Sequence, residues 1–95
     1  MNQAERKRIL AETAEKVALL NEFRTEDFRD GVARLIASAR EVWRDENGEL
    51  PRRGESEAFD ALIGIADEAD GSPIAVRDAA DRALRVAGRG AKAAR

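Results

Sequence analysis

The chain has 95 residues, no cysteine, no histidine and a net charge of −2; this length suits one domain with a modest core that buries about 60 to 70% of the unfolded surface. Without cysteine there can be no disulfide, thiolate nucleophile or Cys-based zinc site, and we expect a reducing, cytoplasmic environment. No apolar run reaches the length of a membrane span and no signal-peptide core follows the first charges, so we expect a soluble, non-secreted protein with no membrane partner.

The first helix is predicted over residues 3–22. Asn2 and Glu5 have the spacing of a capping box, which opens a helix near residue 3. Apolar residues then recur at spacings of three and four, and so share one helical face; they are Ile9, Leu10, Ala14, Val17 and Leu20.

The second helix is predicted over residues 26–44, with Thr25 as its N-cap and two acidic residues in its first turn. The turn dipeptide Asn47-Gly48 and the following Pro51 end it, so residues 45–55 are expected to form a loop. Its apolar stripe is the most regular in the chain and comprises Phe28, Val32, Leu35, Ile36, Ala39, Val42 and Trp43.

Two further helices are predicted over residues 57–69 and 73–87. Ser56 can cap the third helix, although Gly64 inside it costs about 1 kcal/mol relative to alanine. Ser72, followed by a proline, opens the fourth helix, because proline is tolerated at the first helical position.

The predicted fold class is all-α, a small bundle of about four helices. We expect a single helical domain over residues 1–88, closed by Gly88 and Gly90 and followed by a disordered basic tail at residues 89–95. The sequence has 19 alanines and 22 larger apolar residues, of which only four are aromatic. Helix interfaces must therefore be built largely from methyl groups, which favours completion of the burial by a second chain.

Charge is distributed unevenly along the chain. Residues 1–44 carry nine basic and eight acidic side chains, residues 45–72 carry two and nine, and residues 73–95 carry six and two. An acidic middle beside a basic end is interpreted first as solvated surfaces of opposite sign; in the alternatives it is self-complementary, marks two binding faces, or imitates nucleic acid. Arginine outnumbers lysine 14 to 3, a bias that we interpret as GC-rich coding and hence as a bacterial or phage origin.

Residue types that carry catalysis are scarce. Histidine and tyrosine are absent, which removes the commonest general base and a frequent acid, and no phosphate loop or nucleophile elbow occurs. Asp67, Glu68 and Asp70 are interpreted as solvated carboxylates, and the acidic stretch 45–49 lacks the glycine and glutamate positions of a calcium loop. We expect no enzyme, no cofactor and no metal site.

The favoured function is a non-catalytic protein–protein interaction module, such as a regulatory subunit or inhibitor of a larger bacterial or phage assembly, which also self-associates as a homodimer. Trp43 is interpreted first as a core residue. In the alternative it forms a contact surface with Arg40 or Arg44, because Trp and Arg are enriched among residues that carry binding energy. The candidate partner-binding residues are Phe23, Arg40, Trp43, Arg44, Arg52 and Arg53.

The alternative function is a DNA-binding regulator, because residues 65–85 resemble a helix-turn-helix in part. Ala66, Ser72 and Val76 fall where that motif has a small residue, a turn residue and a buried branched residue, although Asp70 precedes the turn glycine. Acidic residues on the same helix would repel phosphate, and an ordinary helical hairpin is the competing interpretation. The candidate nucleic-acid-binding residues are Ser72, Arg77, Arg82, Arg85 and Arg89.

Overall fold

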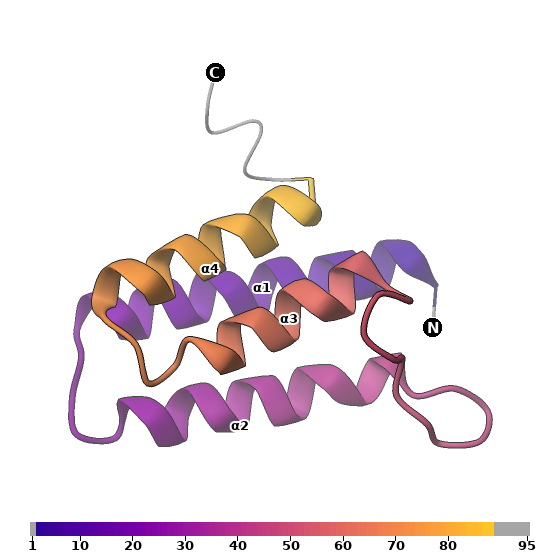
Figure 1. Cartoon of the computed structure of the whole chain (residues 1–95), viewed down its shortest axis with the longest axis horizontal. Coiled ribbons are helices and arrows are strands. Elements are labelled where there is room, and N and C mark those ends of the chain that lie inside the picture. The colour runs from indigo at the N-terminus through magenta and orange to yellow at the C-terminus, as the bar shows by residue number, and fades with distance from the viewer. Residues whose placement is uncertain (1, 89–95) are drawn as a thin grey trace.

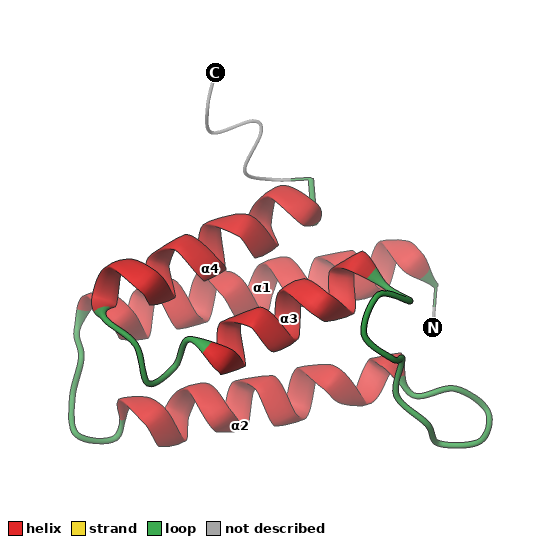
Figure 2. Ribbon diagram, in the orientation of Figure 1, coloured by secondary structure: helices red, strands yellow, loops and turns green. Residues whose placement is uncertain are grey.

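Four α-helices and one short 3-10 helix make up the structure, a computed structural model that describes residues 2–88 (Figure 1; Figure 2). Residues 2–88 contain no strand, so the predicted all-α class is confirmed. The predicted basic tail at residues 89–95 lies outside the described residues. The elements are α1 (Gln3–Glu22), α2 (Phe28–Arg40), η1 (Glu41–Trp43), α3 (Glu57–Asp67) and α4 (Pro73–Val86).

Side-chain caps open three of the helices where the sequence predicts them. The Asn2 Oδ1 accepts a hydrogen bond from the backbone N–H three residues later at 2.8 Å, the Ser56 Oγ at 3.2 Å and the Ser72 Oγ at 3.1 Å. Each cap satisfies an N–H that has no partner inside its helix. At the end of α4, Gly88 has a φ of +87°, a left-handed conformation that glycine adopts without a steric penalty.

The predicted second helix, residues 26–44, differs from the structure at both ends. Thr25 does not cap it, because its Oγ1 accepts from the Asp27 N–H at 3.3 Å and its C=O accepts from the Phe28 N–H at 3.1 Å. These bonds make a local turn, which threonine forms as readily as a helix cap. At the other end the chain tightens into η1, and Arg44 is extended with a ψ of 139°.

The connection between α3 and α4 begins earlier than predicted. The third helix, predicted over 57–69, ends at Asp67, where the Glu68 N–H bonds both the Gly64 and Ile65 carbonyls at 3.2 Å. The Gly71 N–H then bonds the Glu68 carbonyl at 2.8 Å, which closes a tight turn. The fourth helix ends at residue 86, one residue before its predicted end, so both differences lie within the ordinary uncertainty of helix boundaries.

The predicted turn at Asn47-Gly48 is confirmed. The Gly48 N–H bonds the Asp45 carbonyl at 2.9 Å, and the Asp45 N–H bonds the Glu49 carbonyl at 2.9 Å. The Asp45 carboxylate also accepts from the Asn47 and Glu49 N–H groups at 2.8 and 2.9 Å. Gly48 has a φ of +75°, which explains the glycine at this corner.

Helix α1 packs against all three of the other α-helices and most extensively against α4. In Figure 1 it lies behind α3 and α4, which run side by side in opposite directions. The Asn21 side-chain amide donates to the Pro73 carbonyl at 2.8 Å, and the Arg24 guanidinium donates to the Gly71 carbonyl at 3.0 Å. These bonds tie the end of α1 to the start of α4.

Alanine supplies much of the core, as the composition predicts. The rings of Trp43 and Phe59 meet at a centroid distance of 5.9 Å and a tilt of 54°, a geometry that suits aromatic pairs. No described helix has both the length and the apolar character that crossing a membrane requires. The buried alanines are Ala11, Ala14, Ala39, Ala58, Ala61, Ala80 and Ala83, and the largest fully buried side chains are Leu10, Val17, Val32, Leu62, Ile65 and Val76.

Candidate interaction surface

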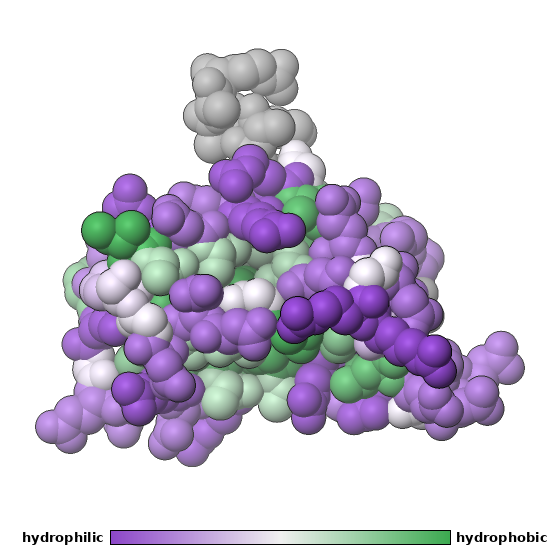
Figure 3. Space-filling view, viewed as in Figure 1, coloured by the Kyte–Doolittle hydropathy of each residue, from purple (hydrophilic) through white to green (hydrophobic). Residues whose placement is uncertain are grey.

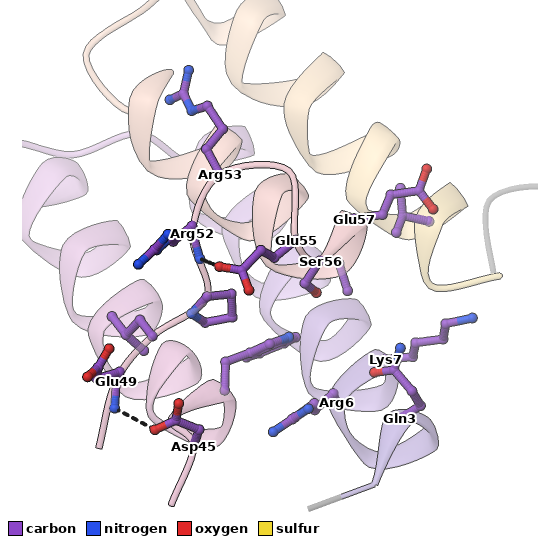
Figure 4. A pocket seen from close by; sticks show the side chains of 15 residues that line it. Gln3, Arg6, Lys7, Asp45, Glu49, Arg52, Arg53, Glu55, Ser56 and Glu57 are labelled. Carbon is purple, nitrogen blue, oxygen red and sulfur yellow. Dashed lines mark hydrogen bonds between the residues drawn. The ribbon is translucent and has the colours of Figure 1, made fainter. Parts of the chain in front are cut away.

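An open pocket of about 850 Å³ lies at the end of the bundle where the start of α1, the end of α4, the loop after η1 and the start of α3 meet (Figure 4). We call it the polar pocket, because charged side chains dominate its lining. Its basic residues are Arg6, Lys7, Arg52 and Arg53, its acidic residues are Asp45, Glu49, Glu55 and Glu57, and its apolar residues are Trp43, Leu50, Pro51, Ala58 and Val86.

A tight turn positions the two arginines of the loop. The Arg52 N–H donates to the Glu55 carboxylate at 2.8 Å, and the Glu55 N–H donates to the Arg52 carbonyl at 3.0 Å. Gly54, with a φ of +90°, donates its N–H to the Asp60 carboxylate at 3.0 Å and so joins the turn to α3. The guanidinium groups of Arg52 and Arg53 extend from this turn, as Figure 4 shows.

The basic side chains of the polar pocket are mostly free to bind. Arg6 donates its Nε–H to the Val42 carbonyl at 3.0 Å, which leaves its terminal N–H groups for another acceptor. Within residues 2–88, the side chains of Lys7, Arg52 and Arg53 form neither an ion pair nor a hydrogen bond. Three cations that have no partner among the described residues therefore border one pocket.

Trp43 borders the pocket from the core side, and the core interpretation of this residue is confirmed. Its side chain is 2% exposed and packs among the buried residues of the bundle. The indole Nε1–H is buried without an acceptor among the described residues, which costs free energy relative to an apolar ring of similar shape. The indole ring therefore lies on the core side of the pocket and is not exposed at the molecular surface.

Arg40 and Arg44 lie close to the pocket but do not line it. Arg44 donates to the Glu41 carboxylate at 2.9 Å and to the Gly48 carbonyl at 2.8 Å. The hydrogen bond from Arg44 lowers the pKa of the Glu41 carboxyl, and the charges of Arg44 and Arg40 act in the same direction. The Arg40 Nε is buried 4.0 Å from the Glu41 carboxylate and has no hydrogen-bond partner in the described part of the chain. These two arginines interact with the end of α2 and the loop that follows it, and they do not form part of the pocket surface.

The structure brings together only some of the predicted partner-binding residues. Trp43, Arg52 and Arg53 border the polar pocket, whereas Phe23 lies at the opposite end of the bundle, where α1 ends (Figure 1). Sequence reasoning missed Arg6 and Lys7, which reach the pocket because the start of α1 packs beside the end of α4. A signal did exist, because two cations near a helix N-terminus oppose the helix dipole and call for another explanation.

The segment compared with a helix-turn-helix is an antiparallel hairpin in which α3 and α4 lie side by side (Figure 1). The hydroxyl of Ser72 caps α4. Arg82 shares a groove of about 400 Å³ between the helices with the carboxylates of Asp60, Glu68 and Asp78. Arg77 and Arg85 are exposed on α4, and the remaining DNA-binding candidate, Arg89, lies outside the described residues.

Apolar side chains are exposed at the end of the bundle away from the pocket. Phe23 is 68% exposed, Leu19 is 59% exposed and Ile74 is 71% exposed. On the face shown in Figure 3 hydrophilic residues predominate, and apolar surface is limited to patches along the helices. The exposed apolar residues therefore stand out against a mostly polar surface.

No group of three or more His, Cys, Asp or Glu residues within the described part of the chain is placed to hold a metal ion. Comparison of the chain with protein-family models, curated proteins and solved structures finds no match.

Proposed function

We propose that this chain is a non-catalytic protein-binding module that receives a partner protein at the polar pocket, in the manner of a regulatory subunit or an inhibitor of a larger assembly. The observation that carries the proposal is the gathering of Arg6, Lys7, Arg52 and Arg53 around one pocket, where three of these cations form no ion pair within residues 2–88. Arginine fits this role because its planar guanidinium forms paired hydrogen bonds with carboxylates.

The mixed charge of the pocket favours a protein over other partners. Four acidic side chains line the pocket beside the four basic ones, and these carboxylates would repel the phosphates of a nucleic acid. Sites for small molecules are mostly apolar with a few polar groups, whereas charged residues dominate here. A protein surface that carries both signs of charge complements both sets of side chains.

The proposal is tested by comparing proteins captured from a lysate of the source cells by two charge-matched variants. Arg52→Ser/Arg53→Ser removes two pocket cations, and Arg34→Ser/Arg77→Ser removes two exposed arginines from other surfaces. We expect a partner that binds the wild-type protein and the control variant, and that binds the pocket variant at least about thirtyfold more weakly, because two lost hot-spot contacts at about 1 to 2 kcal/mol each cost about 2 to 4 kcal/mol together.

Two results would contradict the proposal. One is the absence of any protein captured by the wild-type chain. The other is equal loss of binding in the pocket variant and in the control, because that result would assign binding to overall charge rather than to the pocket. Circular dichroism of each variant checks that its helix content is unchanged.

A further inference from the structure

A second surface, on the outer face of α1, carries an inference that goes beyond the proposed function. Leu10, Ala14 and Val17 are buried on the inner face of this helix. Leu19 lies in the last turn of α1, and Phe23 directly follows the helix as its C-cap residue; both side chains are more than half exposed. No described element covers this pair, which we call the outer strip of α1.

Exposure of the outer strip is costly for this chain. Phe23 is one of only four aromatic residues, and the other three are buried in the core. Burying a phenylalanine or leucine side chain contributes about 1.5 to 3 kcal/mol, so the bundle forgoes this gain at two neighbouring positions. A covering partner would recover it.

The charges beside the outer strip indicate which partner fits. Lys16 precedes Leu19 by three residues, and Glu22 follows it by three. Both charged side chains belong to exposed residues, and neither has a partner among residues 2–88. Opposite charges at equal distances on the two sides of one apolar residue are self-complementary when two copies of the helix run in opposite directions.

We infer that a second copy of this chain covers the outer strip. Two α1 helices cross antiparallel at Leu19 about a twofold axis, so that Lys16 of each copy faces Glu22 of the other and Phe23 is covered by the neighbouring helix. Such an interface uses the same patch on both copies. The residues argued to form it are far fewer than the roughly 20 to 30 residues a side of a stable complex, so the dimer is reversible and forms as the protein concentration rises.

Charge reversal with rescue tests this geometry by sedimentation equilibrium over a series of protein concentrations. The single variants Lys16→Glu and Glu22→Lys replace two ion pairs of the dimer by two repulsions, and we expect each to raise the dimer dissociation constant by about tenfold. The double variant Lys16→Glu/Glu22→Lys restores both pairs with reversed sign, and we expect its dissociation constant to return to within about threefold of the wild-type value.

The outcomes separate this inference from the proposed function. A wild-type protein that stays monomeric at every concentration overturns the inference, and so does a double variant that associates as weakly as the single variants. Phe23→Ser should weaken the dimer without affecting capture of a partner at the polar pocket. Arg52→Ser/Arg53→Ser should dimerise like the wild-type protein. If the proposal for one surface is contradicted, the proposal for the other surface can therefore still be tested. Circular dichroism checks that the single variants keep the helix content of α1.

Discussion

The ring and the indole N–H of Trp43 have opposite effects on stability. Its ring fills the core against Phe59, and its indole N–H is buried without an acceptor among residues 2–88. Trp43→Ala should therefore lower the free energy of unfolding by about 3 to 5 kcal/mol, because it leaves a cavity. Trp43→Phe should cost much less, because it keeps an aromatic ring and removes the unsatisfied donor. Urea unfolding followed by circular dichroism measures both losses, and a loss as large in Trp43→Phe as in Trp43→Ala would contradict this account.

The pair formed by Glu41 and Arg44 gives a prediction about pH. The hydrogen bond from Arg44 lowers the pKa of the Glu41 carboxyl, so the stabilisation from this pair is present at neutral pH and is lost as the pH falls through the lowered pKa. In Arg44→Gln, an NMR titration should show the pKa of Glu41 rising toward its ordinary value. Arg40→Gln should shift it less, because Arg40 is 4.0 Å away and contributes only through its charge; the reverse order would contradict this account.

At the scale of single elements, the N-caps explain where the helices begin. Ser72→Ala should lower the free energy of unfolding by about 0.5 to 2 kcal/mol, because it removes the acceptor of the capping hydrogen bond at the start of α4. Ser38→Ala makes the same change at an exposed interior position of α2 and should stay within about 0.5 kcal/mol of the wild type. Thermal and urea unfolding compare the two variants, and equal losses of stability would contradict the stabilising role of the Ser72 cap.

Replacing two glycines of the α3–α4 hairpin by alanine should change the free energy of unfolding in opposite directions. A Cβ at Gly64 would meet no atom within 4 Å, so Gly64→Ala should raise the free energy of unfolding by about 0.5 to 1 kcal/mol. Gly88 has a φ of +87°, which alanine adopts at a cost, so Gly88→Ala should lower it by about 1 kcal/mol. Urea unfolding measures both changes, and a loss of stability in Gly64→Ala would contradict the open space at that position.

The predictability of each element follows from how local its signals are. The caps at Asn2, Ser56 and Ser72 depend on residues three positions away, so the sequence predicts the starts of three helices correctly. Thr25 could either cap a helix or close a local turn, and the sequence alone does not separate these options. The chain tightens into η1 at the end of α2, where Trp43 packs against Phe59 of α3, a contact between distant segments that local sequence signals do not reveal.

The candidate site was harder to predict than the elements, because it forms between segments far apart in the sequence. Arg52 and Arg53 are accessible to sequence reasoning because they lie in the predicted loop 45–55, which follows Trp43. Arg6 and Lys7 reach the same pocket only through the packing of α1 beside α4. Phe23 was predicted together with Arg52 and Arg53, and the fold places it at the opposite end of the bundle, on the surface to which we assign self-association.

At the scale of the whole molecule, an alanine-rich core gives close helix packing with little apolar area per contact. The resulting bundle measures 37 × 33 × 19 Å along its principal axes and leaves Leu19 and Phe23 outside the core. The polar pocket lies at the opposite end from Phe23. A module of this shape can hold a second copy along α1 while it receives a different protein at the pocket.

Amide hydrogen exchange on the wild-type chain, alone and with the protein that it captures from the lysate, tests the central claim most directly. We predict that the partner slows exchange in the segments that border the polar pocket, residues 3–7 and 50–58, and leaves residues 73–82 of α4 unchanged. Unchanged exchange in both pocket segments, with slowed exchange elsewhere on the bundle, would contradict the assignment of the pocket as the partner-binding surface.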